Sequence, residues 1–240
     1  TLMTAERLGF GLTVAQRDAL HSTLVWVKDY FDNVPPDTQV GGHGFDKTMR
    51  QAGMAAIITS RENYPVFLPV LTATVMDVGR ATQDPRSKNF QHGRLSREMI
   101  DTDLFGSLAI LTGEDSILVG NAVEDHSKLN ENVRRSYIVE AAMDADRLDC
   151  LGALGPLRAA SWRPNIPLIL PKETDTSSGD TQIQTMYQDM AYRHMGWVDM
   201  LWTQTARDIA KPRVQAYQIY LKRLQREASF SYQAFRGLSI

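Results

Sequence analysis

Several stretches of the sequence combine histidine, aspartate and basic side chains at spacings that could support proton transfer or metal binding. In GGHGFDKTMR at 41–50, His43 and Lys47 are four residues apart and would share one face of a helix. In TVMDVGR at 74–80, Asp77 follows a long apolar run and precedes a glycine. The other members of the set are His92, the pair Asp125-His126 and the acidic segment AAMDADRLDCLGALG at 141–155.

The segment 141–155 places Asp144, Asp146 and Asp149 among apolar residues that must pack in a core. Burying a carboxylate is unfavourable unless a cation meets it. The segment therefore predicts a metal ion or basic side chains close to these acids.

Each of these residues also has an ordinary structural interpretation. His92 and His126 lie in polar sequence and could be surface side chains. Asp77 could cap a helix, and Asp146 could form an ion pair with the neighbouring Arg147. The order His, Asp, His, His, Asp along successive helical segments makes coincidence a poorer explanation for the whole set than for any one member.

Helices must position these side chains, because the dominant hydrophobic period is helical. In 14–32 the apolar residues return near one face, and the sequence NVPP at 33–36 ends the helix. Residues 64–80 are apolar nearly all round, which is typical of a central buried helix. Neither an internal repeat nor a sustained strand-like alternation is present, so the sequence predicts an all-α fold. The expected helices are 14–32, 45–60, 64–80, 95–112, 115–127, 132–160, 183–207 and 209–228.

The length of 240 residues suits a single domain with a substantial core. We expect this core over about 14–160, followed by a loop at 161–182 and C-terminal helices at 183–230. Long loops often act as lids, and Trp162 would then close over a substrate. A disordered connection is the alternative.

The composition argues against several classes of partner. A formal net charge of −2 without a basic run disfavours nucleic acid and anionic membrane surfaces. No apolar stretch reaches the roughly 18 residues of a membrane span. The single cysteine, Cys150, excludes an internal disulfide and a multi-thiolate zinc site, which favours a cytoplasmic protein. The Met-rich, aromatic segment 186–202 is typical of a core or a subunit interface, so a homodimer is one arrangement to test.

Together these motifs resemble the HD-domain phosphohydrolase superfamily, in particular its compact single-domain bacterial-type branch. In that branch His-Gly-Phe-x-His opens a helix, a buried helix ends in His-Asp-Ile-Gly, and a His-Ser precedes Asp-Ala-Asp-Arg-Leu-Asp-Ala-Leu-Gly-Ala. This chain has HGFDK, MDVGR, DHS and DADRLDCLGALG in the same order, and TQTARDIAKPR at 203–213 resembles the C-terminal motif of the branch. The resemblance spans nearly the whole chain and implies an HD-like helical bundle.

The resemblance also implies four metal ligands, and these fall at Lys47, Met76, Asp77 and Asp146. Only the two aspartates are retained. A protonated lysine cannot coordinate a cation, and a thioether is too soft for Mg²⁺, Mn²⁺ or Fe²⁺. We therefore expect no metal and no cofactor, and we expect the Lys47 ammonium to stand where the charge of the metal stood.

An unorthodox metal site remains as an alternative. His43 or His126 could join Asp77 and Asp146 in holding an ion. In addition, His92 and His126 match positions at which some HD relatives hold a second metal.

Three functions follow from these features. The first is an enzyme with metal-independent acid–base chemistry, which could be isomerisation, cyclisation, elimination or hydrolysis, on a small organic molecule. The second is a metal-dependent phosphohydrolase of nucleotides or phosphate esters. The third is a non-catalytic relative that binds a ligand or partner. For the first function the expected catalytic residues are Lys47, Asp77, His92, His126 and Asp146, and the expected substrate-binding residues are His43, Asp46, Met76, Arg80, Arg147 and Trp162.

Overall fold

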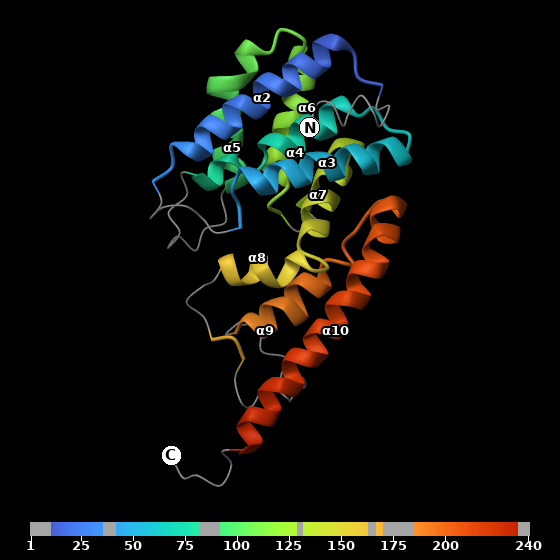
Figure 1. Cartoon of the computed structure of the whole chain (residues 1–240). Coiled ribbons are helices and arrows are strands. Elements are labelled where there is room, and N and C mark those ends of the chain that lie inside the picture. The colour runs from blue at the N-terminus through green and yellow to red at the C-terminus, as the bar shows by residue number, and fades with distance from the viewer. Residues whose placement is uncertain are drawn as a thin grey trace.

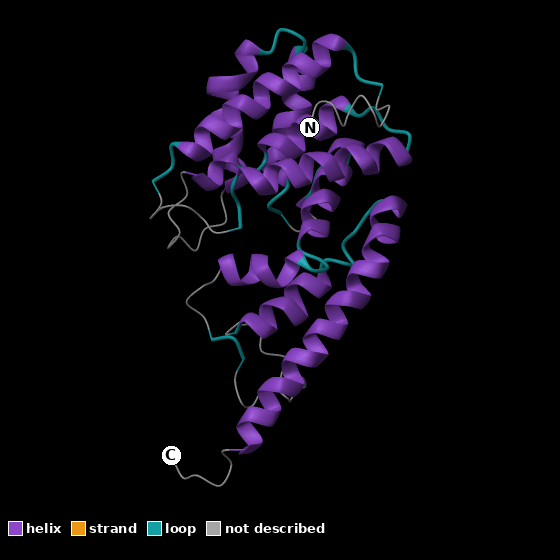
Figure 2. Ribbon diagram, in the orientation of Figure 1, coloured by secondary structure: helices purple, strands orange, loops and turns teal. Residues whose placement is uncertain are grey.

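The computed structural model of the chain describes residues 11–35, 42–81, 92–128, 132–162, 167–169 and 185–234. All regular structure in these residues is helical, and none of it is strand (Figure 1, Figure 2). The predicted all-α class is confirmed. None of the described helices is long and apolar enough to cross a membrane.

The larger part of the molecule is a helical bundle built around α4 (Figure 1). Every residue of α4 is buried, because its side chains are apolar or threonine on all sides and α2, α3, α6 and α7 surround it. The expected central helix is therefore present. The bundle consists of α2 (Val14–Asp32), α3 (Phe45–Arg61), α4 (Phe67–Val75), α5 (His92–Met99), α6 (Gly113–Asp125) and α7 (Tyr137–Asp149).

The end of α4 differs from the predicted helix 64–80. The α-helix stops at Val75, and a 3₁₀ turn, η1 (Val78–Ala81), follows. A methyl group on Gly79 would lie 2.5 Å from the Ser96 nitrogen and 2.6 Å from the His92 carbonyl oxygen. The missing side chain thus lets η1 lie directly against α5, and this contact brings the end of α4 close to His92.

The predicted helix 132–160 is broken into two. Helix α7 ends at Asp149, Gly152 has φ +78°, and α8 (Leu154–Trp162) begins two residues later. This left-handed conformation is one that glycine adopts readily. The break turns the chain away from the bundle, so that α8 lies below α7 in the orientation of Figure 1.

The boundary between the last two predicted helices is also displaced. A short α9 (Met186–Gln188) continues as the π-helical η5 (Asp189–His194), and α10 (Gln204–Ala234) follows. The predicted boundary at 207–209 is absent, because α10 runs through these residues and through Pro212. Instead, α10 begins where Asp144 accepts hydrogen bonds from the backbone N–H groups of Trp202 and Thr203.

Helices α8, α9 and α10 and the η5 segment enclose a second, smaller core below the bundle (Figure 1). Most of the predicted lid at 161–182 lies outside the described residues. The buried members of this second core are Ala159, Tyr187, Met190, Tyr217 and Leu221.

Two short helical segments complete the bundle between α5 and α6. They are the π-helical η2 (Ile100–Leu104) and the 3₁₀ turn η3 (Phe105–Ser107). Together with α5 they replace the single helix predicted over 95–112.

Candidate functional site

Lys47 lies at the centre of the candidate site and is only 1% exposed. It comes from the first turn of α3, and its ammonium group donates a hydrogen bond to Oδ2 of Asp77, just after α4. The same Nζ atom lies 2.9 Å from Oδ1 of Asp146 on α7. Three elements far apart in the sequence therefore converge on one buried cation.

Additional polar groups complete the surroundings of the two carboxylates. Gln51 donates to Oδ1 of Asp146 over 2.6 Å, and the Arg80 Nε atom lies 3.5 Å from Oδ1 of Asp77. From α8, the Arg158 guanidinium approaches Asp146 to 3.8 Å and Asp149 to 3.3 Å.

Sequence reasoning missed Gln51 and Arg158. Gln51 follows Lys47 by four residues, so the helical period of α3 could have placed it on the same face. No comparable signal marked Arg158, because its position depends on how α8 packs below the bundle.

The surrounding charges determine the pKa values of both aspartates. Burial by itself would raise the pKa of Asp77, but the positive charge of Lys47 holds it well below its usual range. Burial opposes ionisation of Asp146 as well, and the Lys47 charge again prevails and lowers its pKa. Both carboxylates are therefore ionised at neutral pH.

His92 and His126 form a hydrogen-bonded pair beside Asp77. Their Nε2 atoms lie 2.9 Å apart, and they are 3.8 Å and 3.7 Å from Oδ1 of Asp77. The Nδ1 atom of His126 faces the Val123 carbonyl oxygen at 2.5 Å. Because a carbonyl oxygen only accepts, His126 Nδ1 carries a hydrogen.

The proton positions of the neutral pair follow from this contact. His126 Nε2 has no hydrogen, so it accepts from Nε2–H of His92. The Nδ1 atom of His92 then holds a lone pair, and this buried atom has no hydrogen-bond partner among the residues that the structure describes. Burial, followed by the charges of neighbours such as Arg80, holds the pKa of His92 well below its usual range. The arrangement leaves a basic nitrogen at one end of the pair.

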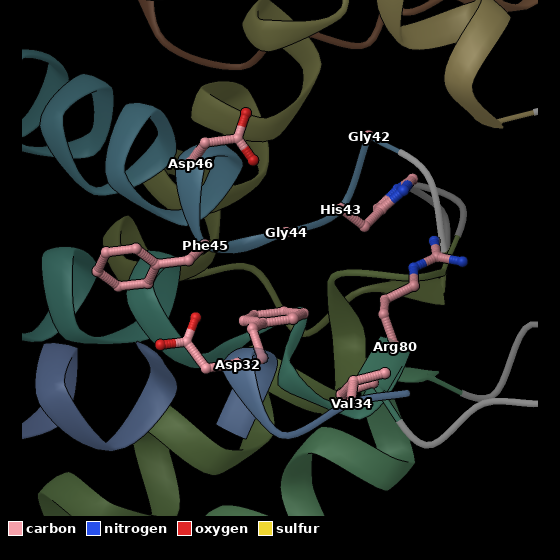
Figure 3. A pocket seen from close by; sticks show the side chains of 10 residues that line it. Asp32, Val34, Gly42, His43, Gly44, Phe45, Asp46 and Arg80 are labelled. Carbon is pink, nitrogen blue, oxygen red and sulfur yellow. The ribbon is translucent and has the colours of Figure 1, made fainter. Parts of the chain in front are cut away.

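His43 and Arg80 connect this charged centre to a cavity of about 300 Å³, since His43 Nε2 lies 3.5 Å from the Arg158 guanidinium and Arg80 lies 3.5 Å from Asp77. The cavity is lined by the start of α3, the end of α2 and the turn η1. Figure 3 shows the Arg80 guanidinium pointing toward the His43 imidazole, whereas Phe45 and Asp46 point away from them. Burial, with the charges of Lys47 and Arg80, lowers the pKa of His43 well below its usual range.

Several predicted site residues lie apart from the centre. The Asp46 side chain is 72% exposed and binds Arg50 at the cavity rim. Arg147 points toward the segment that precedes α10: it donates to the Met200 carbonyl, and its guanidinium lies 4.9 Å from the centre of the Trp202 ring. Met76 packs fully buried in the core, and the side chain of Trp162 lies outside the described residues.

The residues at the four positions implied by the HD resemblance do not fit a metal ion. The Lys47 ammonium occupies the space between Asp77 and Asp146, and the apolar Met76 side chain belongs to the core cluster. A different set does converge: one ligand atom each from Asp77, His92 and His126 lies within 4.8 Å of the others. These three residues have the donor types that suit a divalent cation.

Comparison with known proteins identifies the fold. No protein-family model and no curated protein sequence matches the chain. Among solved structures, Bacillus subtilis YpgQ in complex with ADP is 23% identical with a TM-score of 0.65, covering 89% of this chain and 97% of YpgQ.

Two other solved structures carry the superfamily name. A Bacillus thuringiensis HD-superfamily hydrolase is 17% identical with a TM-score of 0.62 and covers 88% and 97% of the two chains. A predicted HD superfamily hydrolase from an uncultured Thermotogales bacterium is 19% identical with a TM-score of 0.57, over 86% and 91%. The chain therefore has the HD-domain fold.

Proposed function

We propose that this HD-fold protein is an enzyme that carries out metal-independent acid–base chemistry on a small organic molecule. The observation that carries the proposal is the position of the Lys47 ammonium, bonded to Asp77 and 2.9 Å from Asp146. A fixed positive charge thus neutralises the carboxylates that bind a metal in the HD relatives the sequence resembles.

Charge balance supports this interpretation. A buried carboxylate without a partner is strongly unfavourable, and here each one has a cationic neighbour within 3.8 Å. The centre therefore requires no additional cation to be stable. The acids of this group are Asp77, Asp146 and Asp149, and its cations are Lys47, Arg80 and Arg158.

The histidine pair provides the proton-transfer groups of the proposal. His92 takes a proton at Nδ1, and His126 accepts the Nε2 proton of His92 more strongly as positive charge develops on that ring. Asp77 is ionised and lies within 3.8 Å of both Nε2 atoms, so it stabilises the charged pair. Lys47 keeps Asp77 ionised and holds it in place. Returning the proton to a different atom of the substrate completes an isomerisation or cyclisation; in an elimination, the bond to the leaving group breaks with its electron pair and that group takes up the proton.

Metal analysis tests the charge-replacement part of the proposal. The full chain is purified without chelator, dialysed against Mn²⁺, Fe²⁺ or Ni²⁺ and measured for metal per chain. We expect no stoichiometric metal in the wild type and about one ion per chain in the double variant Lys47→His/Met76→His, which restores two imidazoles beside Asp77 and Asp146. Stoichiometric wild-type metal that disappears in Asp146→Asn would contradict the proposal.

Turnover tests the catalytic part. Small organic molecules are incubated with the protein in EDTA and followed by NMR for conversion or for solvent hydrogen exchange. We expect conversion that falls at least 100-fold in His92→Gln, since a general base contributes about 10²–10⁴ in rate. The exposed variant His21→Gln, made in the same way, serves as the control and should keep full activity.

The convergence of Asp77, His92 and His126 favours a second candidate, a metal-dependent phosphohydrolase. These residues would hold a divalent cation, which would activate water and neutralise phosphoryl oxygens when bound. Stoichiometric metal that is lost in His92→Gln but retained in Asp146→Asn would favour this candidate over the first.

A further inference from the structure

The cavity beside the charged centre has two deep polar side chains in its wall. His43 is 7% exposed and Arg80 is 8% exposed, and both line the cavity. The other polar side chains among the described lining residues, Asp32 and Asp46, are 57% and 72% exposed and lie at the solvent side. A ligand in the cavity would therefore meet one imidazole and one guanidinium at its inner end.

The charges of these residues indicate how much negative charge a ligand should carry. Arg80 lines the cavity and lies 3.5 Å from Asp77, whereas the Arg158 guanidinium lies 3.5 Å from His43 Nε2 and is shared with Asp146 and Asp149. His43 is neutral, since burial and nearby cations hold its pKa low. Asp32 and Asp46 lie at the mouth, where they form ion pairs with Lys28 and Arg50. Among the described residues, each cation near the cavity thus already faces a carboxylate, so a dianion such as a phosphate monoester would bring two uncompensated charges where a monoanion brings one.

The other walls and the size of the cavity indicate the remainder of the ligand. Phe31, Val34, Phe45 and Ala81 supply apolar surface. The volume of about 300 Å³ is at the lower end of the range for small-molecule sites. The backbone at the start of α3 also lines the cavity, and the positive end of the helix dipole favours an anion there.

We infer that this cavity binds a small monocarboxylate with an apolar body, whose carboxylate Arg80 and His43 hold while the body contacts Phe31 and Phe45. The inference names the substrate class of the proposed enzyme and rests on that proposed function; Arg80, 3.5 Å from Asp77, links the cavity to the histidine pair beside Asp77. It differs from the phosphate-ester class that the superfamily resemblance implies.

Binding of three probes of similar size tests the inference. Phenylacetate carries one negative charge, phenyl phosphate carries close to two at pH 8, and phenylacetamide carries none. Affinities of the full-length chain are measured by calorimetry in EDTA, with saturation-transfer NMR for weak binding. We expect phenylacetate to bind at least about tenfold more tightly than either other probe. Phenylacetamide should bind more weakly because a charge-assisted hydrogen bond is stronger than a neutral one. Phenyl phosphate should bind more weakly because its second negative charge has no matching cation among the described residues.

Variants locate the bound probe. We expect Arg80→Gln to weaken phenylacetate binding about 10- to 100-fold and Arg80→Lys to weaken it less. Val34→Phe fills the cavity without changing any charge, so it should abolish binding even if Arg80→Gln fails to fold. The exposed Lys211→Gln on α10 is the matched control and should bind normally.

Three results would overturn the inference: no saturable phenylacetate binding, phenyl phosphate binding as tightly or more tightly, or phenylacetate binding unchanged in both Arg80→Gln and Val34→Phe. None of these depends on turnover. Binding without any His92-dependent turnover would refute the proposed function and leave the inference standing, whereas tight phenyl phosphate binding would refute the inference alone.

Discussion

The Nε2 atoms of His92 and His126 lie 2.9 Å apart, and this contact fixes the proton positions of both rings. One Nε2 must carry a hydrogen and the other must accept it. The Val123 carbonyl oxygen beside His126 Nδ1 can only accept a hydrogen bond, so His126 carries its hydrogen on Nδ1 and its Nε2 is the acceptor. The two histidines therefore act as one unit with a single basic end at His92.

Nuclear magnetic resonance can verify this assignment directly. We expect long-range ¹H–¹⁵N spectra at pH 8 to show His126 as the Nδ1–H tautomer and His92 as the Nε2–H tautomer. Solvent-exposed His21 provides the reference for an unconstrained ring. The opposite tautomer on His126 would rule out the proton path proposed above.

Replacing Lys47 should destabilise the fold strongly. Lys47→Met leaves Asp77 and Asp146 facing one another without their shared cation, and removing one partner of a buried ion pair costs about 3–5 kcal/mol of unfolding free energy. Urea denaturation measures the loss. The control is Lys28→Met, which breaks an exposed pair with Asp32 and should cost less than about 1 kcal/mol. Equal effects of the two changes would contradict the central role of Lys47.

Stability should fall with acid in two stages. His194 is buried, and burial together with Arg193 lowers its pKa to about 3. Near pH 6.5 this histidine becomes protonated in the unfolded chain but stays neutral in the folded chain. The stability present above pH 6.5 is therefore lost as the pH falls toward 3, by about 1.4 kcal/mol per pH unit for each such histidine. His43 and His92 have lowered pKa values and act in the same direction.

The second stage of the loss of stability results from protonation of Asp77. Its folded pKa is depressed, so its contribution is complete above about pH 4, the unfolded value, and is lost as pH falls further toward the folded value. Urea midpoints measured from pH 8 to pH 3 follow both stages. His194→Phe should reduce the slope between pH 6 and pH 4 by about one proton, whereas His21→Phe should leave it unchanged; an unaltered slope in His194→Phe would refute the assignment.

Asp144 should be important for stability without taking part in chemistry. Its buried carboxylate accepts hydrogen bonds from the backbone of Trp202 and Thr203 and from the Thr203 hydroxyl, so it caps the start of α10. We expect Asp144→Ala to cost about 2–4 kcal/mol, since it removes a cap and leaves buried donors unpaired. Asp208→Ala, an exposed position on α10, should cost less than about 1 kcal/mol in the same denaturation assay.

Two glycines should respond oppositely to alanine. In Gly79→Ala the new methyl group meets backbone atoms of Ser96 and His92 at 2.5 Å and 2.6 Å, so η1 and α5 must move apart. Gly53 is exposed in the middle of α3, with no atom within 4 Å of such a methyl group. Gly53→Ala should therefore stabilise the protein by about 0.5–1 kcal/mol, whereas Gly79→Ala destabilises it and shifts the His92 resonances. Unchanged His92 resonances in Gly79→Ala would contradict this account.

The sequence by itself determined the helical class, because hydrophobic period and helix-ending residues are local properties of the chain. The bounds of α2 and α3 agree closely with the predicted 14–32 and 45–60 for this reason. The break between α7 and α8 was missed, because the glycine at 152 does not by itself end a helix. It adopts a left-handed turn here because α8 packs below the bundle and does not continue α7. The start of α10 was missed as well, since its cap is supplied by Asp144 from a distant helix.

The pairing of Lys47 with Asp77 and Asp146 could be anticipated for two reasons. Buried carboxylates are stable only beside a cation, and Lys47 is a basic residue on the same helical face as His43. Only the tertiary structure decided which of the remaining polar residues join them. Arg147 lies next to Asp146 in sequence but on another face of α7, toward Trp202, whereas Arg158 reaches the centre from α8. Sequence spacing fixes the direction of a side chain along its own helix, but the packing of helices determines what that direction meets.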